Sequence, residues 1–338
     1  MKVTLKISAA LLFGTCLALA SEPGSFDRTL TVSGPLQLDV RSDPGGIIIT
    51  SGPDTAVHVH AVLNPLYGRF DLDLAEANIH ALERNPPIEQ VGNCIRIGYL
   101  NDPAVLRGVS MRLEIQTPRG TRVHAHTISG GIRIAGLNGP ADTETSSGKT
   151  EIGNIAADVS VVSHSGGIII HSTGSSVSAR NESGGIQIVN IHGSVDTQTT
   201  SGRTEISEVS GDVRSVTHSG SIRIDNAEGA VTARNTSGNI DAFQLTGSVH
   251  AETRSGAIQI GQARPAPIRA LTDSGSIRVE LASRGGYSID AQSVSGRVSG
   301  PVSAGVPQIA ENHHLKEQLD GGGALVDLDT HSSRINIE

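Results

Sequence analysis

The sequence predicts an all-β fold, a single-stranded β-helix (β-solenoid) of the right-handed type with coils of about 18 residues. Three observations predict it. The dipeptide Ser-Gly recurs at a fixed spacing, apolar residues recur at fixed offsets from each Ser, and aromatic residues make up only 2% of the 338 residues. A chain that repeats at so short a period cannot bury an apolar face within one repeat, so successive coils must stack on one another.

Ser-Gly marks a turn in each predicted coil. It occurs eight times at a spacing of 18 residues and then at Ser274 and Ser295, after spacings of 19 and 21. The eight regular pairs are Ser129-Gly130, Ser147-Gly148, Ser165-Gly166, Ser183-Gly184, Ser201-Gly202, Ser219-Gly220, Ser237-Gly238 and Ser255-Gly256. We assign them a structural role, because Gly adopts backbone conformations that other residues avoid. A repeated catalytic Ser has no chemical purpose, and a phosphate-binding loop needs a strand–loop–helix context that these turns lack.

Alternating apolar positions flank each Ser-Gly pair. An apolar residue stands six positions before each Ser, such as Val159 or Val195, and Ile mostly stands three and five positions after it, such as Ile168 and Ile170. This period of two is typical of strands with one buried face, so each coil has at least two strands. Thr, Ser or Asn stands two positions before each Ser, and we expect these side chains to hydrogen-bond along the stack.

A longer repeat of 54 residues, equal to three coils, overlies the coils. Residues 141–152 reappear with few changes as residues 195–206, and residues 162–166 resemble residues 216–220. We infer that the array grew by duplication of three-coil blocks.

The first twenty residues have the features of a secretory signal peptide. Lys2 and Lys6 precede an apolar stretch, and Ala18-Leu19-Ala20 forms a small-x-small cleavage site. A lipoprotein modified at Cys16 is the alternative, although the residues before Cys16 suit a lipobox poorly. No later segment is long and apolar enough for a membrane helix. We therefore expect an exported mature chain with no transmembrane segment, located in the periplasm, at the cell surface or outside the cell.

Both ends of the expected mature chain depart from the regular pattern. Residues 36–49 predict a first coil with an insertion at its turn, and residues 326–337 predict a last coil. Between Asp71 and Arg84 the apolar residues have helical spacing, which predicts a short helix covering the open β-edge near the N-terminal end. The expected parts are a signal peptide (1–20), an N-terminal capping part of the solenoid (21–120), regular coils (121–300), and an insertion with a closing coil (301–338).

Charge and cysteine content exclude two further classes. The formal net charge is −8, and Lys149 and Lys316 are the only lysines after residue 6, so we expect no nucleic-acid partner. Once the signal peptide is removed, Cys94 is alone and no intramolecular disulfide is expected. Its strand-like surroundings predict a small buried side chain.

Three features of the chain are shared with one bacterial family. They are residues 111–121 leading into the first regular coil, the serial Ser-Gly-x-Ile-x-Ile coils, and Gly321-Gly322-Gly323-Ala324 before the last coil. In these features most of the mature chain resembles the "putative adhesin" β-helix family, a group of exported or envelope proteins of largely unknown function. The resemblance implies the fold and export, and it gives no catalytic residues to transfer to this sequence.

The sequence gives little support for an enzyme. Asp142 and Glu144 share a predicted exposed face, but Asp196, in the equivalent position three coils later, is about 14 Å away by strand spacing. Paired catalytic carboxylates of glycosidases lie about 5–9.5 Å apart. Between residues 121 and 300, Phe243 and Tyr287 are the only aromatic residues that could form a sugar platform. We therefore expect a protein without catalytic activity.

Two His-x-His pairs are candidates for a metal site. His58 and His60 form one pair and His124 and His126 the other, and each pair is predicted to face outward from a strand. Four imidazoles could bind a transition metal if the two strands lay side by side. Exposed polar strand residues give the same pattern, so we assign no metal and no cofactor.

These observations favour an exported, non-catalytic β-solenoid scaffold or adhesin-like binding protein of the cell envelope. Its partner would be an envelope protein or a surface glycan. A polysaccharide-acting β-helix enzyme and a self-assembling structural solenoid are the alternatives. A local function is expected where the repeat breaks, at residues 50–110, 261–273 and 301–323.

Overall fold

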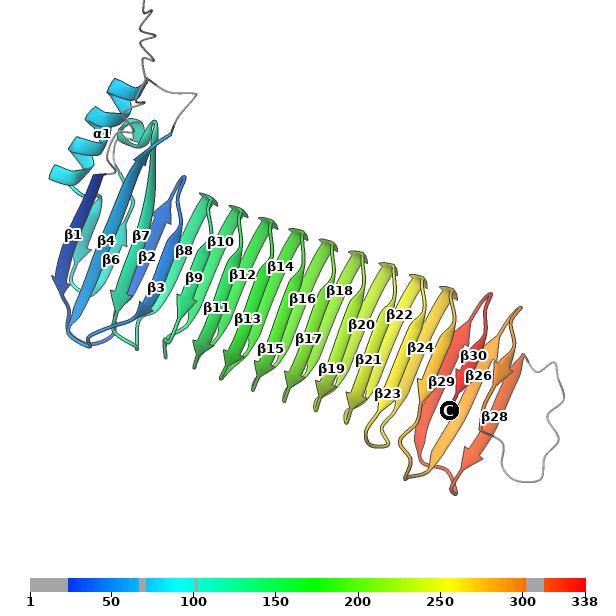
Figure 1. The fold of residues 1–338 in the computed structure, drawn as a ribbon. Helices are drawn as coiled ribbons and strands as arrows, with labels where there is room; N and C mark the ends of the chain where they lie inside the picture. Colours follow the sequence, from blue (N-terminus) through cyan, green and yellow to red (C-terminus); the bar gives the residue numbers. More distant parts are fainter. Residues whose placement is uncertain (1–23, 67–70, 101–102, 302–312) are drawn as a thin grey trace, which may run out of the picture.

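The computed structural model describes residues 24–66, 71–100, 103–301 and 313–338, and these form a β-solenoid of two long sheets (Figure 1). Each sheet has 15 strands in the described part of the chain. The predicted solenoid with coils of about 18 residues is confirmed, and each regular coil gives one strand to each sheet. The expected signal peptide and Cys16 lie outside the described residues.

Nine regular coils form the middle of the stack within the described residues. In the sheet that we call sheet B, their strands are β8 (Arg122–Ser129), β10 (Ala141–Ser147), β12 (Val159–Ser165), β14 (Val177–Ser183), β16 (Val195–Ser201), β18 (Val213–Ser219), β20 (Val231–Ser237), β22 (Val249–Ser255) and β24 (Ile268–Ser274). In sheet A they are β9 (Ile132–Ala135), β11 (Thr150–Ile155), β13 (Ile168–Thr173), β15 (Ile186–Ile191), β17 (Thr204–Val209), β19 (Ile222–Ala227), β21 (Ile240–Leu245), β23 (Ile258–Gln262) and β25 (Ile277–Glu280). Neighbouring strands are parallel, and equivalent residues pair directly, as Val159 does with Val177.

The core lies between the two sheets and consists of the inward columns that the sequence predicts. Val159, Ile168 and Ile170 are all buried, as are their equivalents in the other coils. Sheet A has one further inward position, because a residue with positive φ follows the Ile-x-Ile pair and turns the next side chain inward. In the coil that contains Ile168, this residue is Ser172, with a φ of 56°, and it brings Thr173 into the core. The column of positive-φ residues is Asn154, Ser172, Asn190, Glu208, Asn226 and Gln244.

The Ser-Gly pairs lie at the turns from sheet B to sheet A. At Gly166 the φ is +131°, and an added Cβ would meet the carbonyl of Gly148 in the preceding coil. The backbones of successive turns therefore approach too closely for any other residue. The polar column before each Ser also contacts these turns, since the amide Nδ2 of Asn181 donates to the carbonyl oxygen of Gly166 at 2.8 Å. The expected hydrogen bonds along the stack form at Thr127, Asn181, Asn235 and Thr253, which donate to backbone carbonyls of the preceding coil. The prediction is wrong for Thr145, Ser163, Thr199 and Thr217, whose buried hydroxyls have no hydrogen-bond partner among the described residues.

The N-terminal end is capped by strands that reverse direction. The first coil, β2 (Gln37–Ser42) and β3 (Ile47–Ser51), pairs directly with β8 and β9. Outside it, sheet A continues with β7 (Val109–Thr117), β4 (Ala56–Pro65) and β1 (Gly24–Thr31), of which β4 is antiparallel to both neighbours. Sheet B continues with β6 (Cys94–Ile97) and β5 (Ile88–Val91). Later segments of the chain therefore cover the first coil.

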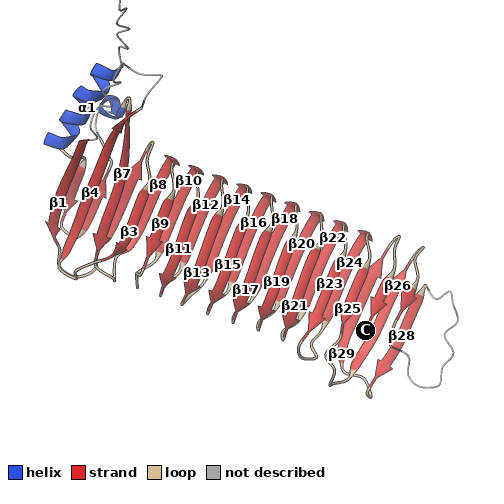
Figure 2. Ribbon diagram, viewed as in Figure 1, coloured by secondary structure: helices blue, strands red, loops and turns tan. Residues whose placement is uncertain are grey.

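The predicted helix is confirmed as α1 (Leu72–Arg84), which packs against β1 and β4 at this end (Figure 2). Asp71 caps it, because its side chain accepts a hydrogen bond from the backbone N–H of Asp73. Ala75, Ile79 and Leu82 form its buried face. A short 3-10 helix, η1 (Pro103–Leu106), follows β6. None of the helices in the described ranges is long and apolar enough to cross a membrane.

The C-terminal coil is not the last coil in space. Strands β29 (Ala324–Thr330) and β30 (Ile335–Ile337) lie between β24–β25 on one side and β26 (Tyr287–Ser293) and β27 (Val298–Ser299) on the other. The strand β28 (His314–Leu319) pairs antiparallel with β26 and forms the end of sheet B. The end of the chain therefore joins the last two coils to each other.

Candidate binding site

The two His-x-His pairs lie on different sheets. His58 and His60 point outward from β4 in sheet A, whereas His124 and His126 lie on β8 in sheet B. The four imidazoles therefore do not gather, and the hypothesis of a shared cluster is wrong. His60 instead contacts Asp27, with 2.8 Å between Nδ1 and Oδ1. In the part of the chain that the structure describes, no three His, Cys, Asp or Glu side chains are placed to hold a metal ion.

Cys94 also differs from its prediction. It is half-buried, because Ile95 and Ile97 take the two inward positions of β6. Its side chain therefore lies outside the core.

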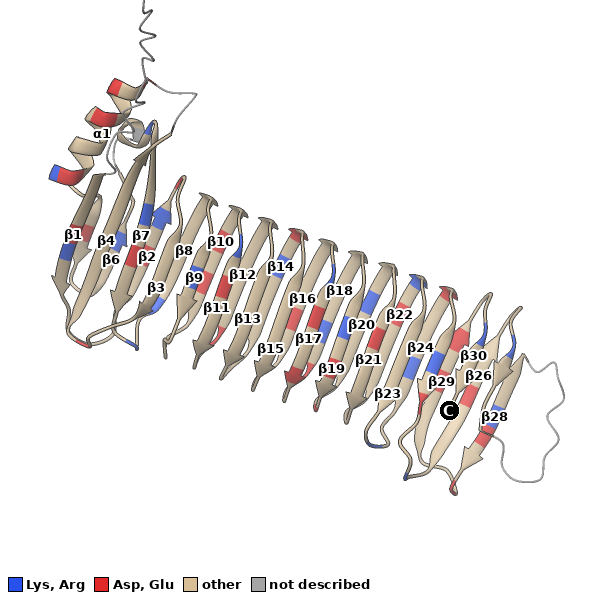
Figure 3. Ribbon diagram, in the orientation of Figure 1, with Lys and Arg blue, Asp and Glu red and all other residues tan. Residues whose placement is uncertain are grey.

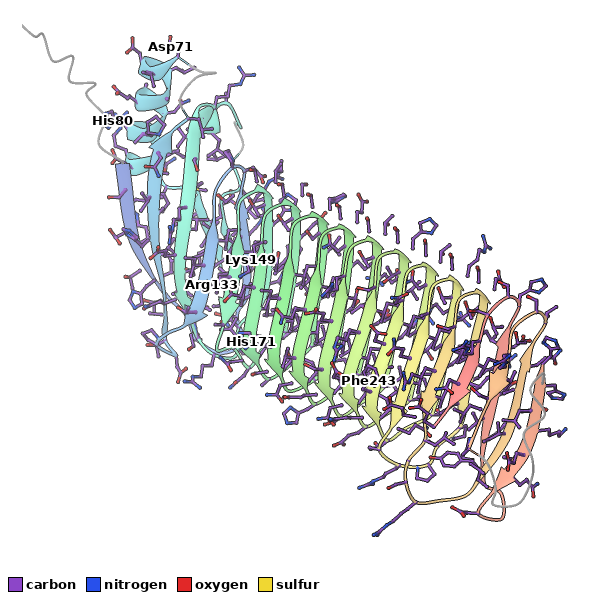
Figure 4. All side chains as sticks on the ribbon, turned by 45° about the vertical axis from the view of Figure 1, so that its right-hand side comes forward. Asp71, His80, Arg133, Lys149, His171 and Phe243 are labelled. Atoms are coloured by element: carbon purple, nitrogen blue, oxygen red, sulfur yellow. The ribbon has the colours of Figure 1, made fainter. Side chains whose placement is uncertain are left out.

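The outer faces of the regular coils carry interspersed charges of both signs (Figure 3). Many of these charges pair between neighbouring coils. Glu151, for example, contacts Arg133 of the preceding coil at 3.2 Å and Lys149 of its own coil at 3.1 Å. Figure 4 labels these two basic side chains. The ammonium of Lys149 lowers the pKa of Glu151 below its ordinary value. Such pairs make a solvated surface on which many charges are neutralised by a neighbour.

A groove of about 610 Å³ runs along the outside of sheet B, next to the residues that directly precede β12, β14, β16, β18 and β20. Small side chains such as Ser160 and Ser178 line it. Its carboxylate at Asp158 already accepts hydrogen bonds from Ser175 and from the backbone N–H of Ser176. The carboxylate of Asp212 likewise accepts a hydrogen bond from the backbone N–H of Ala230.

A cleft of about 660 Å³ at the N-terminal end has a different character. We call it the N-terminal cleft, and its polar side chains come from Arg41, Asp43, Glu89, Arg96, Tyr99 and Arg107. Leu66, Leu100, Leu106 and Ile128 supply its apolar walls. It lies where the capping segments cross the outer face of sheet B, so it interrupts the regular repeat.

Glycine makes the crossing possible. Gly98 has a φ of +83°, and an added Cβ would overlap the carbonyl oxygen of Arg41 on β2. Only Gly allows the chain after β6 to pass this close to β2 and to carry Tyr99 and Leu100 over the sheet. The opposite wall is tied to α1, because the Nδ2 of Asn78 donates to the carbonyl oxygen of Arg107 at 3.0 Å.

The acidic groups of the N-terminal cleft have partners. The side chain of Asp43 is 13% exposed, and its carboxylate accepts from the backbone N–H of Ile128 at 2.6 Å and from Nε of Arg41 at 2.5 Å. Glu89 contacts Nη1 of Arg96 at 3.4 Å. These contacts fix both carboxylates and one edge of each guanidinium.

Tyr99 adds an aromatic ring. The guanidinium of Arg96 lies over this ring, 4.2 Å from its centroid. Burial, together with the nearby carboxylate of Asp39, raises the pKa of Tyr99. Its hydroxyl therefore remains protonated at neutral pH and can donate a hydrogen bond.

An imidazole between two carboxylates borders the cleft. In His126, Nδ1 lies 3.6 Å from Oε2 of Glu144, and Nε2 lies 3.9 Å from Oδ1 of Asp43. Residue-by-residue reading of the sequence named His126 and Glu144 but missed Asp43. The signal that could have found it is the inserted Asp43-Pro44 at the turn of the first coil.

A family model and several solved structures are similar to this chain. Residues 172–338 match the model of the family described as Toastrack DUF4097, and no curated protein matches the chain. A structure of a putative cell adhesion protein from Clostridium sporogenes is 10% identical, with a TM-score of 0.22 over 94% of this chain and 99% of that one. Putative adhesins from Parabacteroides distasonis (11% identical, TM-score 0.35, 76% and 97% covered) and Bacteroides fragilis (12% identical, TM-score 0.28, 94% and 99% covered) are also similar. The predicted resemblance is confirmed, and over residues 172–338 the chain resembles the Toastrack β-solenoids.

Proposed function

We propose that the protein is an exported, non-catalytic scaffold of the cell envelope that binds its ligand in the N-terminal cleft. The observation that carries the proposal is the cleft itself, which combines an aromatic ring, three Arg side chains and apolar walls at a break in the repeat. Binding sites of this kind are concave and largely apolar, with a few fixed polar groups. On the regular coils the charged side chains mostly pair with one another.

The solenoid supports this role as a rigid spacer. Nine regular coils at about 4.8 Å per coil place about 43 Å of solenoid between the cleft and the two coils at the C-terminal end. Each coil is hydrogen-bonded to both neighbours throughout, so the stack is expected to hold the cleft at a fixed distance. This is the geometry of a binding module presented on a stalk.

A binding screen tests the proposal. The mature chain would be applied to an array of bacterial envelope glycans and to immobilised envelope proteins. The matched variants are Y99A in the cleft and F243A, which removes an aromatic ring from the outer face of sheet A. We expect the wild type and F243A to bind the same ligand and Y99A to lose most of the binding. Equal binding by Y99A would move the site elsewhere, and absence of any ligand would refute the binding role.

One observation favours an enzyme as the second candidate. The imidazole of His126 between Asp43 and Glu144 could exchange a proton with a bound polysaccharide. Incubation with envelope polysaccharides, followed by chromatography of the products, tests this candidate. Cleavage by the wild type but not by H126Q would establish catalysis at the cleft, and unchanged polysaccharides would exclude it for the substrates tested.

The self-assembling solenoid receives less support. Antiparallel strands stand at both described ends of the stack, as in β1–β4 and β26–β28. At the outer strands β1, β5 and β28 a second copy would meet an antiparallel pair and could not continue the parallel order of the coils. Light scattering of the mature protein at high concentration would reveal assembly if it occurred.

A further inference from the structure

We infer that the N-terminal cleft takes an acidic saccharide, meaning one or two sugar rings that carry an oxyanion such as a carboxylate or a phosphate. The inference rests on the proposed binding function and names the ligand class for the same site. It follows from the excess of hydrogen-bond donors over acceptors, the pairing of the carboxylates with neighbouring groups, and the mixture of apolar and polar side chains on the walls.

The donors of the cleft exceed its acceptors. Three guanidinium groups carry about fifteen N–H donors. Within the described residues, the hydrogen bonds of these groups are those from Arg41 to Asp43 and from Arg96 to Glu89. Arg107 has no carboxylate partner in that part of the chain. A guanidinium beside a cleft that is not paired with any described carboxylate is suited to a two-pronged contact with a carboxylate or phosphate.

The carboxylates of the cleft do not compete for a cationic ligand. One oxygen of Asp43 is held by Arg41 and the other by the backbone N–H of Ile128. Glu89 contacts Arg96. Arg41 and Arg96 are each paired with one of these two carboxylates, and the guanidinium of Arg107 is paired with neither. The anion contact is therefore assigned to Arg107.

The walls of the N-terminal cleft are suited to a sugar ring. The hydroxyl of Tyr99 can donate a hydrogen bond, and Leu66, Leu100 and Leu106 cover apolar area on the sides. Sugar rings present apolar C–H faces together with hydroxyl groups, and they satisfy such mixed walls. A volume of about 660 Å³ lies within the range of pockets for small ligands.

Calorimetry on the full mature chain tests the inference with defined probes. They are a digalacturonate, galactose 6-phosphate, and the neutral galactose disaccharide. We expect at least one acidic probe to bind about tenfold more tightly than the neutral disaccharide, and the affinity to fall with added salt. The digalacturonate and phosphate arms identify the source of the oxyanion.

Two Arg variants complete the design. We expect R107Q to weaken binding of the acidic probe about tenfold or more. R264Q removes an exposed Arg outside the cleft and should leave binding unchanged. If neutral and acidic probes bind equally, or R107Q binds as the wild type does, the inference is overturned. Loss of array binding in Y99A together with a neutral ligand would overturn only the ligand class and would leave the proposed function standing.

Discussion

Replacing Gly166 with Ala should break the stack at one turn, whereas the same change at Gly167 should not. At Gly166 the φ is +131°, and the new Cβ would lie 2.0 Å from the carbonyl oxygen of Gly148. Backbone strain of this kind costs about 1–3 kcal/mol. Relieving the overlap by shifting backbone costs a further amount of about 1–3 kcal/mol. We therefore expect G166A to lower the free energy of unfolding by about 2–6 kcal/mol.

Gly167 provides the control beside it in the chain. No atom lies within 4 Å of a Cβ added there, and its φ is outside the left-handed region. The substitution G167A should therefore raise stability by about 0.4–1 kcal/mol through the unfolded chain. Denaturant unfolding followed by far-UV circular dichroism measures both variants. A G166A protein within about 1 kcal/mol of G167A would refute the argument that the turns stack too closely for a side chain.

Three further predictions concern stability. Glu208 has a φ of 57°, and Asn tolerates this left-handed conformation better than Glu does, so E208N should raise the free energy of unfolding by about 1 kcal/mol. A lower midpoint temperature of E208N in a thermal scan would contradict this. The hydroxyl of Thr150 is buried and has no hydrogen-bond partner among the described residues. T150V should therefore raise the free energy of unfolding, measured in denaturant, by about 1 kcal/mol, and a lower value would contradict this reasoning. Hydrogen bonding to His314 lowers the pKa of Asp290 in the folded protein. The ionised carboxylate of Asp290 therefore stabilises the fold above its unfolded pKa of about 4, and this contribution is lost as the pH falls through its lower pKa in the folded protein. Stability should fall between about pH 5 and pH 2, and D290N should reduce this fall, which unfolding series at several pH values would measure.

The coils and the helix could be predicted from the sequence because their signals are local. Each Ser-Gly turn and the Ile pair after it lie within six residues, and stacking repeats the same environment in every coil. The apolar face of α1, with Ala75, Ile79 and Leu82, likewise lies within one segment. In such elements one short window determines which side chains are buried.

The positive-φ column could not be predicted in the same way. Asn154, Asn190 and Asn226 tolerate the left-handed conformation, but Ser172, Glu208 and Gln244 occupy the same position without any such preference. The contacts along the stack impose the conformation on these residues. Sequence reading followed the alternation of Ile-x-Ile and had no reason to expect a change of phase after it.

The N-terminal cleft shows a stronger limit of the same kind. Its polar groups come from β2 and the residue after it, from β5 and β6, from the segment between β6 and η1, and from the residue after η1. They meet because later strands fold back outside the first coil. Arg41 and Arg107 are separated by most of the capping part in sequence, yet they line one space. A repeat pattern predicts contacts between coils that follow one another and says nothing of segments that return. A site built by such a return therefore lies where the repeat is broken, and its chemistry can be identified only after the order of strands is known.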